Sequence, residues 1–208
     1  MVVALLTIIP LVYVATYAAI IGPVDLWHLV VRPRILELLG NTVMIVLACM
    51  AACAALGVGL AVAVERTNLP GRRWWHGLLV APLAVPAFVN GYAWISLAPG
   101  IHGFKGAFLV VTLSYYPLVY LPVVASLRGL DPALEEAAWS LGQSRWRSLR
   151  TVVLPQLRPA VLGDVLLVGL HLLAEFGALA LLRFPTFTTA IYDQYGSTFN
   201  GRAATAMA

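Results

Sequence analysis

Charged residues are scarce in this chain of 208 residues, and hydrophobic residues are correspondingly abundant. Only 11% of the residues are Asp, Glu, Lys or Arg, whereas 61% are hydrophobic, and the mean hydropathy is +0.89. Soluble domains carry about 25% charged and about 45–50% apolar residues, and a soluble fold of this length could not bury so much apolar surface. The composition therefore excludes a water-soluble domain and predicts a membrane protein.

Cysteines and clusters of basic residues are also scarce. The two cysteines, Cys49 and Cys53, lie four residues apart in an apolar run, so on a helix they share one face as small buried hydrophobes. This count excludes a disulfide framework or a cysteine-based metal site. The formal charge is only +4, and the basic residues are dispersed between apolar runs, which is typical of membrane loops and not of a surface that binds nucleic acid.

Apolar stretches long enough to cross a membrane recur along the chain, since a span needs about 20 residues to cross roughly 30 Å of hydrocarbon. The five stretches cover residues 2–21, 42–64, 76–98, 106–127 and 160–182. The third contains Pro82 and Pro86, which we expect to kink it. A signal peptide is an alternative for the first, although no basic residue precedes its apolar stretch. The predicted fold class is an all-α, polytopic membrane helix bundle.

The distribution of Lys and Arg between the loops predicts the orientation of this bundle. The loops after the second and fourth spans lie on one side and hold eight basic residues: Arg66, Arg72, Arg73, Arg128, Arg145, Arg147, Arg150 and Arg158. The opposite side holds five: Arg32, Arg34, Lys105, Arg183 and Arg202. Because cytoplasmic loops carry the excess, we expect residues 128–159 and the N-terminus in the cytoplasm.

The last residues, 203–208, turn apolar again, where a sixth span could begin. We therefore interpret residues 1–208 as a single transmembrane domain that is incomplete at its C-terminus.

The loop at residues 128–159, called the signature loop below, has the local chemistry of two short helices. Asp131 is a good N-cap and is followed by a proline at the first helical position. Gly142 can adopt the left-handed conformation that ends a helix. Ser144 can cap a second helix, which Pro155 would close or kink. Local chemistry alone leaves open an ordinary amphipathic helix resting on the membrane surface.

The signature loop resembles the cytoplasmic motif of permeases in binding-protein-dependent ABC importers, which reads Glu-Ala-Ala, three residues, Gly, nine residues, Ile, one residue, Leu-Pro. The matching residues, with every spacing kept and valine in place of isoleucine, are Glu136, Ala137, Ala138, Gly142, Val152, Leu154 and Pro155. The resemblance implies the type I permease fold. It also implies that the first helix docks on a separate ATPase, with Glu136 making polar contacts and Gly142 forming the bend.

The partners and location that this resemblance implies are those of an importer in a bacterial inner membrane. They are an ABC ATPase dimer, a periplasmic or extracellular substrate-binding protein and a second permease half or subunit, with no nucleic acid. The sequence contains no Gly-x-x-x-x-Gly-Lys-[Ser/Thr] motif for cradling ATP. We therefore expect a transport subunit that is not itself an enzyme and carries no cofactor, with ATP bound by the partner.

Four segments outside the signature loop resemble ferric-iron permeases, and they lie at residues 81–94, 114–122, 174–177 and 189–192. Many such permeases are long chains with two permease halves, and this chain would match the first half. The resemblance implies ferric iron as the cargo. Thiamine, polyamine and sulfate permeases share parts of these segments, so those cargoes stay open.

Ionisable residues inside a predicted span are functional candidates, because charge is costly in hydrocarbon. Glu175 falls in the middle of the fifth span, and His171 precedes it by one turn. We place both on a candidate translocation path, together with Asn90, Tyr115 and Tyr116. The alternative is a structural hydrogen bond from Glu175 to His171 or to a neighbouring helix. Two such residues are too few ligands for a metal site.

A carrier driven by an ion gradient is the competing class of function. Glu175 and His171 would then form a proton relay, which explains the charges within the span. It gives no reason for the spacing of residues 136–155.

The predicted orientation can be tested by labelling. A single cysteine at Ser140, in a background without the native cysteines, should react with an impermeant maleimide in inside-out vesicles but not in intact cells. A cysteine at Lys105 should show the reverse pattern. Labelling of position 140 only from outside the cell would place the signature loop beyond the reach of any cytoplasmic ATPase.

Overall fold

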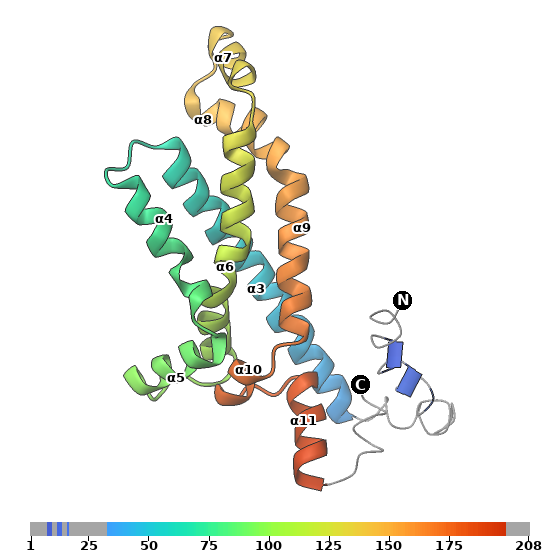
Figure 1. Ribbon diagram of the computed structural model, residues 1–208. Helices are drawn as coiled ribbons and strands as arrows, with labels where there is room; N and C mark the ends of the chain where they lie inside the picture. Colours follow the sequence, from blue (N-terminus) through green and yellow to red (C-terminus); the bar gives the residue numbers. More distant parts are fainter. Residues whose placement is uncertain (1–7, 10–11, 14–15, 17–32, 199–208) are drawn as a thin grey trace.

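The chain folds into a helical bundle in which three long helices run side by side (Figure 1). The computed structural model describes residues 8–9, 12–13, 16 and 33–198, and contains no strand within these ranges. The long helices are α3 (Pro33–Arg66), α6 (Gly103–Gly129) and α9 (Leu154–Leu173). Each belongs to a helical stretch long and apolar enough to cross a membrane, which confirms the all-α membrane bundle. The expected span at 2–21 and the apolar end at 203–208 lie largely or wholly outside the described residues.

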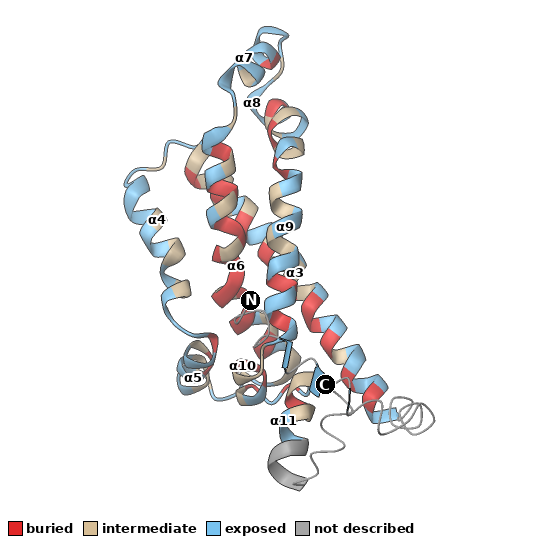
Figure 2. Cartoon of the chain, turned by 45° about the vertical axis from the view of Figure 1, so that its right-hand side comes forward, coloured by how far each residue is buried: buried red, intermediate tan, exposed pale blue. Residues whose placement is uncertain are grey.

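Helix α6 is the centre of the bundle, because α3, α9 and the segment before α5 all pack against it. Val119, Tyr120 and Val123 on α6 are fully buried. The outer faces of α3 and α9 expose large apolar residues, among them Leu47 and Leu162 (Figure 2). Apolar outer faces are what lipid requires of a spanning helix, because the hydrocarbon is as apolar as the side chains it meets.

Helices α3 and α6 approach each other closely at Gly57. A Cβ atom at this position would lie 2.8 Å from Cβ of Val119 and 3.0 Å from the backbone nitrogen of Tyr120. A similar contact joins α9 to α3, where a Cβ on Gly169 would lie 2.8 Å from Sδ of Met50. Small residues let helix backbones approach closely, and in lipid this packing replaces the hydrophobic drive that soluble bundles use.

The predicted third span, residues 76–98, is broken rather than kinked. It comprises α4 (Arg72–Val80), the 3₁₀ turn η1 (Ala81–Ala84) and α5 (Ala87–Leu97), and its two halves bend by 98°. Val85 is extended, with φ −113° and ψ 121°, because the ring of Pro86 disfavours the helical conformation in the residue before it. The two prolines therefore interrupt this segment as expected, and the interruption is a break between two helices. Helix α5 lies at the end of the bundle opposite the signature loop (Figure 1).

The predicted fifth span, residues 160–182, ends earlier than expected, at Leu173. After a turn the chain continues as α10 (Gly177–Leu181) and α11 (Phe187–Thr198). The start of α11 is attached to α3, because the backbone N–H of Phe187 donates to Oγ1 of Thr42 at 3.0 Å. Glu175 therefore lies between two helices, and its expected position in the middle of a span was wrong.

The packing at Gly57 predicts the effect of enlarging this residue. Gly57→Val should separate α3 from α6 and lower the free energy of unfolding by about 1–3 kcal/mol, as overpacking usually does. The measurement is thermal unfolding in detergent. Gly59→Val is the matched control, because a Cβ on Gly59 meets no atom within 4 Å. Equal melting temperatures for the two variants would contradict the close packing.

Candidate functional site

The first helix of the signature loop, α7 (Pro132–Ser140), begins and ends where its local sequence predicts. Oδ1 of Asp131 accepts a hydrogen bond from the backbone N–H of Ala133 at 2.9 Å, which confirms the N-cap. At the other end, N–H of Gln143 donates to the carbonyl of Ala138 at 3.1 Å. Gly142 has φ 78° and donates to the carbonyl of Trp139 at 2.9 Å. These two bonds form a Schellman motif, so α7 is fixed at both ends.

The second part of the loop joins the membrane helix without a break. Oγ of Ser144 accepts from N–H of Arg147 at 3.3 Å and caps α8 (Arg145–Ser148), as predicted. A wide π turn, η2 (Leu149–Val153), leads directly into α9. Pro155 was expected to close or kink the second helix, and this was wrong. It lies in the first turn of α9, and the widened turn before it leaves room for its ring.

The residues of the signature motif divide into an exposed and a packed set. Glu136, Ala137 and Gly142 are exposed on α7 and its end. Ala138 is 5% exposed, so only Ala137 of these two adjacent alanines is open to a partner. The half-buried set, Val152, Leu154 and Pro155, lies where the loop meets the bundle. The exposed set therefore stands on a helix that projects beyond the end of the bundle (Figure 1).

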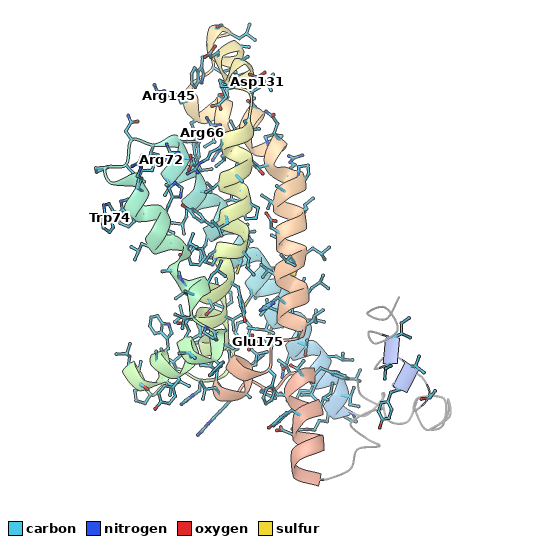
Figure 3. All side chains as sticks on the ribbon, in the orientation of Figure 1. Arg66, Arg72, Trp74, Asp131, Arg145 and Glu175 are labelled. Carbon is cyan, nitrogen blue, oxygen red and sulfur yellow. The ribbon has the colours of Figure 1, made fainter. Side chains whose placement is uncertain are left out.

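A group of ion pairs lies beside the base of this helix, and it was not expected from the sequence. Arg66, the last residue of α3, pairs with Glu135 of α7 at 2.7 Å. Its neighbour Glu65 contacts Arg72 and Arg128. Figure 3 shows Arg66 and Arg72 at the same end of the bundle as Asp131 and Arg145. The available signal was the excess of basic residues in the loops after the second and fourth spans, which does not specify their acidic partners.

A cavity of about 420 Å³ lies near the other end, between α6, α9 and the proline-broken segment. The hydroxyl of Tyr115 donates to Oε2 of Glu175, whose Oε1 accepts from N–H of Ala178 at 3.0 Å. The ring of His171 packs edge-on against Tyr115, with 4.7 Å between the ring centroids. The structure thus brings Tyr115, His171 and Glu175 together. The bond from Glu175 to a neighbouring helix is confirmed, and its partner is Tyr115 of α6.

The two other candidates for a translocation path lie outside this cavity wall. Nδ2 of Asn90 donates to Oγ of Ser114 at 3.1 Å, and Ser114 lines the cavity. The hydroxyl of Tyr116 donates to the carbonyl of Leu79 at 2.8 Å and so joins α6 to α4. Tyr115, His171 and Glu175 therefore line the cavity, whereas Asn90 and Tyr116 hold neighbouring segments together around it.

Comparison with known proteins identifies the class to which this architecture belongs. The family described as "Binding-protein-dependent transport system inner membrane component" matches residues 55–208, and the chain belongs to this family. It is therefore a multi-pass protein of the inner membrane. A solved structure of the MetNI methionine ABC transporter in an inward-facing conformation matches with a TM-score of 0.67 and 19% identity, covering 85% of this chain and 87% of that one. This match confirms the ABC-importer permease fold.

Two curated relatives are permeases of an iron and a sulfate transport system. The chain is 40% identical over 196 residues to the Fe(3+)-transport system permease protein FbpB 2 of Haemophilus influenzae, covering 94% of this chain and 39% of that protein. It is 29% identical over 196 residues to the sulfate transport system permease protein CysT of Escherichia coli, covering 86% of this chain and 70% of that protein. The chain therefore spans well under half the length of the iron relative.

The bonds of Glu175 predict a difference between two replacements. Glu175→Gln keeps a carbonyl for N–H of Ala178 and a polar partner for Tyr115, so its melting temperature in detergent should match the wild type. Glu175→Ala leaves both groups without this partner and should lower the free energy of unfolding by about 1–3 kcal/mol. If glutamine destabilises as much as alanine, the charge and not the hydrogen bonding holds this end of the bundle.

Proposed function

We propose that this chain is the transmembrane permease of an ATP-driven importer, with ferric iron as its cargo and the signature loop as the docking site for a separate ATPase dimer. The observation that carries the proposal is the exposed Glu136 on α7, a helix fixed at both ends and held beyond the bundle. A surface that transmits force to a membrane domain has to be accessible to its partner. It also has to be held in a fixed position relative to the rest of its own chain. Helix α7 meets both conditions.

The path from the docking site to the cavity crosses the turn at residues 141–144 and then runs through continuous helix. From Ser144 the chain passes through α8, η2 and α9 without a break, and α9 carries His171 near its far end. A displacement of α7 would therefore move one wall of the cavity. ATP on the partner and cargo in the cavity would each favour one of two packings, which is how alternating access couples distant sites. ATP binds the ATPase in this scheme, and this chain holds no cofactor.

The chemistry of the cavity supports a cationic cargo. Glu175 lies in its wall, and the described lining residues include neither Lys nor Arg. A carboxylate suits ferric iron better than the sulfate oxyanion of the other relatives, and the iron permease is the relative with 40% identity. Thiamine and polyamines are cationic alternatives. We assign the path to Tyr115, His171 and Glu175, with Asn90 and Tyr116 holding its walls.

The remaining partners follow from the same scheme. A substrate-binding protein would deliver cargo at the end that holds α5 and α11, and a second permease half or subunit would close the path across the cavity. The N-terminus would lie in the cytoplasm with the signature loop. A gradient-driven carrier remains the rival, but it leaves the exposed, doubly capped α7 without a role.

The docking role predicts a specific loss for Glu136→Lys. The reversed charge should abolish retention of the ATPase during purification of the full transporter and abolish iron uptake into vesicles, while the permease still inserts normally. Glu37→Lys is the matched control, because Glu37 is an exposed residue on α3 far from the signature loop. This control should retain the ATPase.

Retention of the ATPase by Glu136→Lys, with unchanged uptake, would overturn the coupling proposal. Uptake of sulfate in place of iron by the wild-type transporter would leave coupling standing and overturn the cargo assignment.

A further inference from the structure

The cytoplasmic end of α3 carries two consecutive charged residues that reach different parts of the molecule. Glu65 has a side chain that is only 5% exposed, and its Oε1 accepts from Nη2 of Arg128 at 2.8 Å and lies 3.0 Å from Nε2 of His76. Its other oxygen contacts Arg72. Arg72 and His76 belong to α4 and Arg128 to α6. Glu65 therefore ties the ends of three membrane helices together.

The next residue, Arg66, reaches the signature loop. Its Nη2 lies 2.7 Å from Oε1 of Glu135, and the two side chains are 30% and 12% exposed. The same nitrogen donates to the carbonyl of Leu127 on α6 at 3.5 Å. Adjacent residues on a helix point about 100° apart, which is why Glu65 and Arg66 can serve different partners. Glu135 immediately precedes Glu136, so the pair lies one residue away from the proposed docking residue.

This pair is the single ion pair that α7 makes within the described part of the chain. Without it, α7 would be joined to the bundle through the turns at its two ends and through its packing against α8 and η2. Movement at a docked helix can then be absorbed by those turns. A charged pair with limited exposure and a hydrogen-bonding distance fixes the helix against α3 in one geometry.

We propose that Arg66 and Glu135 are positioning residues that transmit the movement of α7 to α3 and, through Glu65, to α4 and α6. This inference rests on the proposed coupling function and adds a second route beside the continuous path into α9. Two routes would move both sides of the cavity together, since α6 carries Tyr115 and α9 carries His171.

The alternative is that the pair only stabilises the folded loop. A purely stabilising pair would affect the amount of folded protein and its retention of the ATPase. A transmitting pair would affect how much cargo moves for each ATP hydrolysed, with the ATPase still bound. The ratio of uptake to hydrolysis therefore separates the two roles.

The experiment uses the complete permease with its ATPase and binding protein in proteoliposomes, and compares Arg66→Glu, Glu135→Arg and the double exchange. Each single variant should retain the ATPase but lose about tenfold in cargo uptake per ATP hydrolysed, as expected for one unpaired, partly buried charge. The double exchange restores opposite charges and should recover most of this ratio. Arg73→Glu is the matched control, because Arg73 is exposed and forms no ion pair within the described residues.

Single variants with a wild-type ratio, or a double exchange no better than either single variant, would overturn the inference. Should Arg66→Glu fail to insert, Arg66→Lys and Arg66→Gln replace it, and an equal ratio in both would overturn the inference as well. A wild-type complex that does not retain the ATPase would instead refute the proposed function, so the two failures are distinguishable.

Discussion

The close packing of α3 against α6 is the contact on which both ends of this permease depend. Gly57 lets the two backbones approach, and Cys53, fully buried one turn earlier, points its thiol at the carbonyl of Thr112. At one end, this pair of helices carries Glu65, Arg66 and Arg128, which form ion pairs beside the signature loop. Midway along its length, α6 contributes Tyr115 to the cavity. In lipid, where apolar side chains gain nothing from leaving their solvent, such shape complementarity is what holds two helices in a fixed register.

The signature loop follows a different principle, because its rigidity comes from hydrogen bonds at helix ends. The cap at Asp131 and the Schellman motif at Gly142 satisfy backbone groups that would otherwise be free. Most residues of α7 are exposed, so this helix of nine residues would fray without them. The bundle is thus held by close helix packing and the loop by hydrogen bonds at helix ends. The proposed function requires the bundle and the loop to move together.

The cavity suggests why the broken third span and the early end of α9 matter. Both interruptions place backbone turns beside Tyr115 and Glu175, where the carboxylate fixes the start of α10. Irregular backbone within a membrane protein is tolerated where protein or water covers it. Both breaks contribute residues to the lining of the cavity, Pro86 from the third span and Glu175 from the end of α9.

The sequence by itself determined the membrane class, the helical bundle and the limits of α7. The hydropathy of a span depends only on the residues within it, and a cap such as Asp131 or Gly142 depends on neighbours a few positions away. These features can therefore be predicted without knowledge of the tertiary structure. The spacing of the motif residues at 136–155 could be recognised for the same reason.

Only the tertiary structure decided which distant groups meet. The pair Arg66–Glu135 joins residues 69 positions apart, and Tyr115 meets Glu175 across 60 positions. It also decided that the prolines of the third span turn the chain by 98°, because the angle depends on what packs against each half. Local chemistry limits the conformation of a segment, whereas the partner of a side chain depends on how whole helices pack.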